Sequence, residues 1–232
     1  MMAIRAIQGD DVRACLFSGG KDSTLAVHRM HEDGKDVELL LTAFSKNDYS
    51  YMFHTPNIRL SSMQAEALGI RQATFDTAGV KDDELVDLER ALKEHKVTEL
   101  VTGAVASNYQ KARIDAICAK LKISHVSPLW HIAPLEELEV ISRDFNAIIM
   151  QVSAEGFDDS MLGARIDSKI IARLVELNKR YGINMLFEGG EAETFVLDAP
   201  LFKKRLEVAS FHKEWSGMTG RYLIDKLKFA EK

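Results

Sequence analysis

The stretch "LFSGGKDSTLAVHRM", residues 16–30, decides how the first half of this chain is interpreted. An apolar strand end runs into two adjacent glycines, and a helical pattern follows them directly. A helix N-terminus presents unpaired backbone N–H groups and the positive end of the helix dipole, which suits a phosphate. The glycines allow the backbone to approach a phosphate closely, Ser18 and Ser23 add hydroxyl donors, and Lys21 adds a positive charge. The stretch therefore predicts a phosphate-binding loop.

Two common phosphate loops do not fit this spacing. A Walker A loop needs a glycine five residues before the second glycine and a hydroxyl after Lys21, where this chain has Cys15 and Asp22. The dinucleotide fingerprint needs glycines where Asp22 and Leu25 stand. The glycines also fit a plain strand-to-helix turn in which Asp22 or Ser23 caps the helix. The loop by itself leaves that alternative open.

Apolar runs alternate with helical patterns through the first half of the chain. We expect strands at 12–17, 37–44, 73–75, 99–102 and 124–126, and helices at 23–33, 60–69, 85–92 and 108–121. This alternation predicts an α/β domain, 1–128, with helices on both faces of a parallel sheet and ligands beyond the carboxyl ends of its strands.

The pattern changes after residue 128, which predicts a smaller α+β domain over 129–232. Its expected elements are a helix at 135–144, a strand at 147–152, a helix at 167–181, and strands around "EGGEAETFVLD" (188–198) and "KRLEVASF" (204–211).

The composition limits the class of protein. The formal net charge is −5 over 232 residues, so the broad basic surface that duplex nucleic acid requires is not expected. No apolar run is long enough for a signal peptide or a membrane span, and we expect a cytoplasmic protein without membrane contact. Cys15 and Cys118 lie in apolar patterns and are expected in the core rather than in a disulfide or metal site. Whether the chain forms a homodimer stays open.

The second candidate motif is rich in glutamate. Glu188, Glu191 and Glu193 flank two glycines at an expected turn beside a strand. Closely spaced carboxylates can hold Mg²⁺ on a triphosphate, steer ammonium or deprotonate it. Taken alone, the segment fits a solvated acidic turn better than such a site, and Thr194 is a weaker companion.

Three further candidates lie elsewhere. Tyr109 and Arg113 share a helical face, and Arg113 could bind a phosphate or carboxylate, or pair with a surface acid. His54 could contact a bound ligand, or be a turn residue. His28 and His31 lack the partners of a zinc site and are expected on a helix surface.

The motif "SGGKDS" (18–23) resembles the S-G-G-x-D-[ST] signature of the PP-loop ATP pyrophosphatases, which implies a HUP-like adenine-nucleotide-binding fold and cleavage of ATP to AMP and pyrophosphate. Longer stretches resemble the diphthine–ammonia ligase family: 51–70, 102–121, 127–130, 162–167 and 188–204. Phe187 and Ala192 depart from the usual pattern, which has a glycine and an aromatic residue there.

This resemblance implies a ligase that uses ATP, Mg²⁺ and ammonium to amidate diphthine on elongation factor two. The implied ATP and pyrophosphate ligands are Ser18, Gly19, Gly20, Lys21, Asp22 and Ser23, with Asp22 also on the metal. The implied catalytic residues are Lys21, Asp22, Glu188, Glu191 and Glu193. The expected substrate-binding residues are His54, Tyr109, Arg113, Gly189, Gly190 and Thr194.

The expected chemistry is an acyl-adenylate that ammonia then attacks. No N-terminal nucleophilic cysteine or spare glutaminase segment is recognisable, so we expect external ammonium as the nitrogen donor. Two alternatives remain: a PP-loop enzyme that modifies tRNA or another small carboxylate, and a non-catalytic adenine-nucleotide sensor. A sensor would bind ATP without forming AMP.

Overall fold

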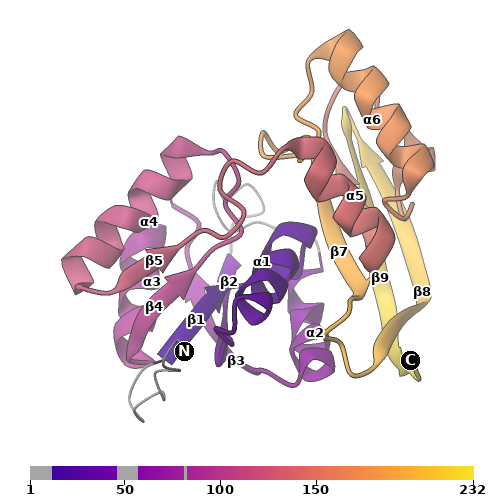
Figure 1. Cartoon of the computed structure of the whole chain (residues 1–232). Helices are drawn as coiled ribbons and strands as arrows, with labels where there is room; N and C mark the ends of the chain where they lie inside the picture. The colour runs from indigo at the N-terminus through magenta and orange to yellow at the C-terminus, as the bar shows by residue number, and fades with distance from the viewer. Residues whose placement is uncertain (1–11, 46–56, 81–82) are drawn as a thin grey trace, which may run out of the picture.

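The computed structural model describes residues 12–45, 57–80 and 83–232 (Figure 1). His54 lies outside the described residues. The elements of the first domain are β1 (Val12–Leu16), α1 (Lys21–Glu32), β2 (Leu39–Ser45), η1 (Ile58–Leu60), α2 (Ser61–Leu68), β3 (Arg71–Thr77), α3 (Asp83–Glu94), β4 (Val97–Val101), α4 (Asn108–Leu121) and β5 (Ser124–Val126). Those of the second are α5 (Pro134–Asp144), β6 (Asn146–Val152), η2 (Asp159–Met161), α6 (Ser168–Tyr181), β7 (Ala192–Asp198), β8 (Arg205–Ser216) and β9 (Thr219–Ala230).

The first domain is built on a five-stranded sheet in the order β3-β2-β1-β4-β5, and all its neighbouring strands are parallel. In the centre, Cys15 of β1 lies opposite Leu40 of β2 and Val101 of β4. The central strands read as continuous apolar runs because helices cover both faces of the sheet. Helices α1 and α2 pack on one face and α3 and α4 on the other. The predicted α/β architecture is confirmed.

Helix α1 begins at Lys21, two residues earlier than predicted. Its N-cap is Gly20, which makes no side-chain cap bond, so the alternative of a turn capped by Asp22 or Ser23 is not what the structure has. The backbone N–H of Lys21 instead donates to Thr194 Oγ1 of β7, at 3.0 Å. An acceptor from β7 of the second domain therefore takes the place of a local side-chain cap.

The second domain holds a four-stranded antiparallel sheet in the order β7-β6-β9-β8. Its first helix, strand and second helix match the predicted ranges closely, and Asp167 caps α6 by accepting from the N–H groups of Lys169 and Ile170. Strand β9 was not predicted. It pairs with β8 through a two-residue turn, with Ser216 opposite Thr219. The α+β expectation for this half is confirmed.

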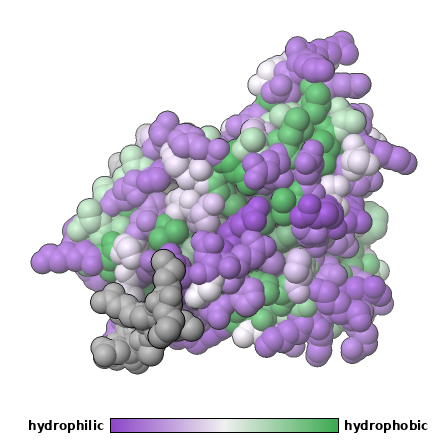
Figure 2. Space-filling view, viewed as in Figure 1, coloured by the Kyte–Doolittle hydropathy of each residue, from purple (hydrophilic) through white to green (hydrophobic). Residues whose placement is uncertain are grey.

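The two domains share their larger apolar core. Phe17 and Leu25, beside the predicted phosphate loop, belong to the same buried cluster as Ile149 and Phe195 of the second sheet. The opposite face of the first sheet closes a smaller core. Figure 2 shows mostly hydrophilic side chains on the viewed face, with hydrophobic ones gathered where α5 and α6 lie together. Among the described residues, no helix has the length and apolar character to cross a membrane.

Candidate active site

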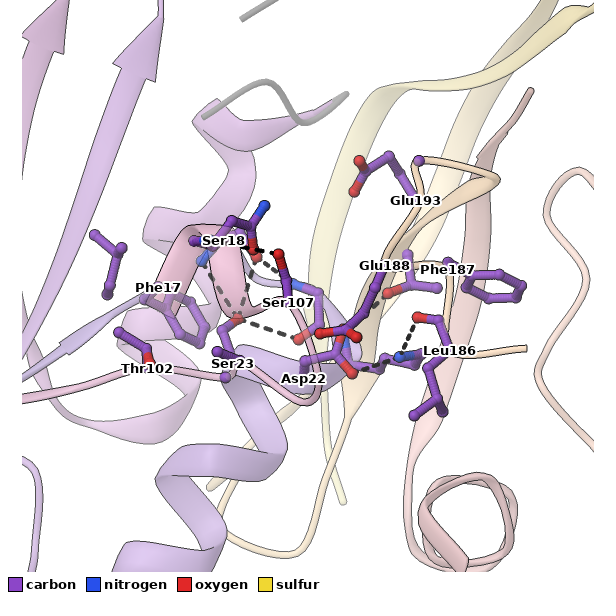
Figure 3. Close-up of a pocket in the computed structure, with 18 of the residues that line it drawn as sticks. Phe17, Ser18, Asp22, Ser23, Thr102, Ser107, Leu186, Phe187, Glu188 and Glu193 are labelled. Atoms are coloured by element: carbon purple, nitrogen blue, oxygen red, sulfur yellow. Dashed lines mark hydrogen bonds and ion pairs between the residues drawn. The ribbon is translucent and has the colours of Figure 1, made fainter. Parts of the chain in front are cut away.

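A cavity of about 570 Å³ lies beyond the carboxyl ends of β1 and β4, between α1 and the segment that enters β7 (Figure 3). Both predicted motifs contribute to its wall. From the first motif the lining includes Ser18, Gly20, Lys21, Asp22 and Ser23, and from the second it includes Glu188, Gly189, Gly190, Glu193 and Thr194. The described part of the lining does not include Gly19, Tyr109, Arg113 or Glu191. The fold thus brings together two segments about 170 residues apart in the sequence.

Hydroxyl groups hold the loop in its turn. Ser18 Oγ and Ser23 Oγ lie 3.2 Å apart, and the N–H of Gly20 donates to Ser18 Oγ at 3.3 Å. The first-turn amides of Asp22 and Ser23 have no acceptor within a helix that starts at Lys21. These amides and the positive end of α1 suit an anion such as pyrophosphate.

Gly19 joins the loop to α2 and β7. Its φ of +78° lies in the left-handed region that favours glycine, and a Cβ there would stand 2.0 Å from Gln64 Oε1. Its carbonyl oxygen accepts from Gln64 Nε2 at 2.8 Å and from the N–H of Val196 at 3.0 Å. Gln64 was not predicted, and it ties the loop to α2.

The Lys21 side chain is fully buried at the junction of the two domains. Its ammonium donates to the carboxylate of Asp22, to Glu137 Oε1 at 3.1 Å and to the carbonyl of Leu186 at 2.9 Å. Burial alone would lower the pKa of Lys21, but the attraction of Asp22 and then Glu137 outweighs it, so the pKa is raised. An ammonium has three donors, and all three are taken here. Its predicted contact with phosphate stays a prediction.

Glu137 is a buried partner of Lys21 that the sequence reasoning missed. Its carboxyl is fully buried in the first turn of α5, and Oε2 has no hydrogen-bond partner among the described residues. Burial raises its pKa to about 8; Lys21 opposes this shift and Asp22 adds to it. A sequence signal existed, because Glu137 occupies the same helical stripe as the buried Leu138 and Ile141.

Glu193 enters the cavity from β7, on the side opposite Thr102 (Figure 3). Burial raises its pKa to about 7, with a further contribution from Asp22 and an opposing one from Lys21. A carboxyl with this pKa exchanges a proton near neutral pH, which is the property of a general base. The carboxylates of Asp22 and Glu193 both line the cavity, and together they attract a cation.

Glu188 and Glu191 bind the protein backbone. Glu188 Oε1 accepts from the N–H groups of Val105 and Ala106, at 3.0 and 2.9 Å, and joins the loop after β4 to the second domain. Glu191 lies outside the described lining, and its two oxygens accept from the N–H groups of Asn184 and Gly189, both at 2.9 Å. The segment is therefore a hydrogen-bonded turn and not a solvated acidic one.

The residues of helix α4 that line the cavity differ from those expected. Arg113 Nη1 donates to Tyr109 Oη at 3.0 Å, as their spacing suggested, but this pair lies outside the described lining. Gln110 and Lys111 line the cavity instead. Because successive residues of a helix point about 100° apart, a shift of one or two positions changes which residue faces a site.

The remaining titratable candidates are structural. His28 is buried, which corrects its predicted surface position. Its Nδ1 lies 2.8 Å from the carbonyl of Thr24, its Nε2 accepts from the N–H of Leu201 at 3.0 Å, and burial lowers its pKa to about 4. Cys15 and Cys118 are buried and free, as predicted.

The described residues contain no cluster of three His, Cys, Asp or Glu side chains that would bind a metal by itself. Mg²⁺ commonly uses one or two carboxylates together with substrate phosphates. Asp22 and Glu193, which both line the cavity, fit that smaller requirement.

Comparison with known proteins identifies the family. Residues 12–125 match the family model described as the diphthamide synthase N-terminal domain, and residues 133–229 match its C-terminal domain. Diphthine–ammonia ligases from Bos taurus and Homo sapiens are each 34% identical over 221 residues, which covers 85% of this chain and 82% of the relative. A solved structure, a predicted tRNA methyltransferase subunit from Methanocaldococcus jannaschii, is 18% identical, with a TM-score of 0.43 over 82% of this chain and 97% of the other. The chain belongs to the diphthine–ammonia ligase (diphthamide synthase) family.

Proposed function

We propose that this chain is an ATP-dependent diphthine–ammonia ligase that acts in the cytoplasm on the diphthine of elongation factor two. The relatives carry that activity in their names, and the two family models match both halves of the chain. One structural observation supports the proposal most directly. A single cavity has the glycine-rich start of α1 on one side and Glu193 on the other. A reaction that joins ATP chemistry to a nitrogen nucleophile needs both in one place.

The proposed reaction has two steps. The acceptor carboxylate attacks the α-phosphate of ATP, forming an acyl-adenylate and releasing pyrophosphate. Ammonia then attacks the acyl carbon and AMP leaves. The first step is needed because a carboxylate is a poor electrophile until one of its oxygens becomes part of a good leaving group.

The residues divide between these steps. The first-turn amides of Asp22 and Ser23 bind the pyrophosphate, and Glu193 takes a proton from ammonium. Asp22 and Glu193 would hold Mg²⁺ together with the ATP phosphates, and the ion would neutralise part of their charge. Glu188 and Glu191 position the wall of the cavity through the backbone. Gly189, Gly190 and Thr194 line the side from which the acceptor would enter.

The test combines ATP, Mg²⁺, ammonium and diphthine-bearing elongation factor two with the chain. We expect AMP and pyrophosphate in equal amounts, matched by the mass change of an acid that becomes an amide. Glutamine in place of ammonium should give no product. ADP and phosphate as main products would contradict the mechanism.

Two other outcomes identify the alternatives. ATP binding without any AMP would indicate a nucleotide sensor. AMP formation with another carboxylate or with tRNA, but not with elongation factor two, would indicate a different acceptor on the same fold.

A further inference from the structure

A chain of hydrogen-bonded side chains lies behind the cavity wall, and the proposed steps make no use of it. Thr102 follows β4 and lines the cavity. Its Oγ1 lies 2.9 Å from His125 Nε2, and His125 Nδ1 lies 2.6 Å from Asp115 Oδ1. Lys111 Nζ donates to the other oxygen of Asp115 at 2.7 Å. The order is hydroxyl, imidazole, carboxylate, as in sites that move a proton.

The chain runs from the cavity to the solvent. The His125 side chain is 4% exposed, whereas that of Asp115, in α4, is 44% exposed. Hydrogen bonds from His125 and then Lys111 lower the pKa of Asp115, so it is ionised at rest and readily releases to water any proton that it receives. An ionised carboxylate on Nδ1 fixes the neutral tautomer with its proton there, and Nε2 is left as an acceptor. That acceptor faces the hydroxyl of Thr102.

The proposed reaction, on which this inference rests, must dispose of protons. Ammonium loses two protons when it becomes the nitrogen of an amide. Near neutral pH one ends on the released pyrophosphate and the other in the solvent. In the proposed reaction the acceptor is a side chain of a protein, and that protein would limit the access of solvent to the cavity while it is bound.

We propose that Thr102, His125 and Asp115 form a proton path from the cavity to the solvent. The Thr102 hydroxyl passes its proton to His125 Nε2 as it receives one from the cavity, and Nδ1 passes its proton to Asp115 and on to water. Each transfer breaks one O–H or N–H bond and forms another, and no electron is exchanged. Thr102 is the end that meets the reactants, and His125 and Asp115 act through it.

The structure offers a matched control. Ser127 Oγ lies 3.0 Å from Thr102 Oγ1 and 3.2 Å from His125 Nε2, so it is a side branch of the path. It is absent from the described lining of the cavity. In the described residues, the polar side chains bonded to His125 are Asp115, Thr102 and Ser127. Removing the Ser127 hydroxyl leaves the direct link between Thr102 and His125.

The first experiment compares amide formation by the full chain and three variants with saturating ATP, ammonium and diphthine-bearing elongation factor two. Thr102→Val keeps the shape and removes the hydroxyl, and kcat should fall on the order of 10²-fold, with an altered pH profile and KM for ATP unchanged. Thr102→Ser should restore kcat, and Ser127→Ala should keep it. Equal kcat for Thr102→Val and the parent, or equal loss in Thr102→Ser, would overturn the path.

The second experiment measures the tautomer of His125 and needs no turnover. It therefore tests the proton path even if the proposed function is wrong. The ¹⁵N shifts of His125 should show the proton on Nδ1 in the parent and in Thr102→Val. In Asp115→Asn this tautomer preference should weaken. A proton held on Nε2 in the parent would overturn the path. Absence of amide from the parent itself, with the expected tautomer, would count against the proposed function alone.

Discussion

Replacing Glu137 by glutamine tests the buried charge cluster at the domain junction. The fully buried Glu137 carboxyl lies 3.1 Å from Lys21 Nζ, and its pKa is raised from 4.5 to about 8, chiefly by burial. Between those values the folded protein holds one more proton than the unfolded chain. The contribution of the protonated Glu137 carboxyl to the free energy of unfolding is therefore complete below pH 4.5, and it is lost as the pH rises through about 8. From about pH 5.5 to 7.5, one such proton lowers the free energy of unfolding by an amount on the order of 2 kcal/mol.

The measurement is urea unfolding of the parent and of Glu137→Gln at several values of pH in that interval. Across this interval the free energy of unfolding of the parent should fall by an amount on the order of 2 kcal/mol more than that of the variant, because glutamine does not titrate. Glu193 contributes equally to both proteins and cancels in the difference. Glu139→Gln, at an exposed position of the same helix, should follow the parent. Parallel pH dependences of the parent and Glu137→Gln would refute the reasoning.

Three other substitutions have defined outcomes. Glu193→Gln should bind Mg²⁺-free ATP as the parent does in calorimetry but lose amide formation on the order of 10²-fold. The rise of the parent's rate through about pH 7 should disappear, and a retained pH profile would exclude Glu193 as the base. Glu191→Gln puts an NH₂ group against one of two backbone donors and should cost about 1–3 kcal/mol in urea unfolding, whereas a solvated turn would show no change. Phe187→Gly removes about 1–2 kcal/mol of strain at φ +69° but also a buried ring that contributes about 3–5 kcal/mol, so the variant should be less stable, and a gain in stability would contradict this balance.

The fold was predictable where local pattern and burial agree. The first sheet could be recognised because its strands are short apolar runs separated by helical stripes, and helices at both faces make that pattern unambiguous. Strand β9 was missed because only part of it is buried and its polar residues interrupt the alternation that marks a strand. The start of α1 was misplaced because its cap comes from Thr194, which no local pattern reveals.

The site was predictable as two motifs but not as a set of contacts. The glycine-rich loop and the glutamate segment both reach the cavity, yet the sequence does not show which carboxylates are free and which bind backbone N–H groups. Gly103 is an example of a residue whose requirement the sequence does not reveal. A Cβ there would stand 2.7 Å from the backbone carbon of Asp22, so this position requires glycine for a tertiary reason. Such constraints come from segments that are distant in the chain.

The lining of the cavity carries an excess of negative charge, which limits how an anionic ligand can bind there. In the described residues, its lining holds three carboxylates, those of Asp22, Glu188 and Glu193, and two lysines. Lys21 donates all three of its hydrogen bonds within the protein, and Lys111 is paired with Asp115. A triphosphate in this cavity must therefore be balanced by the backbone amides at the start of α1 and by a cation that arrives with it. The same carboxylates that would repel a bare phosphate attract Mg²⁺ and ammonium, so an excess of negative charge fits a site that binds an anion only together with cations.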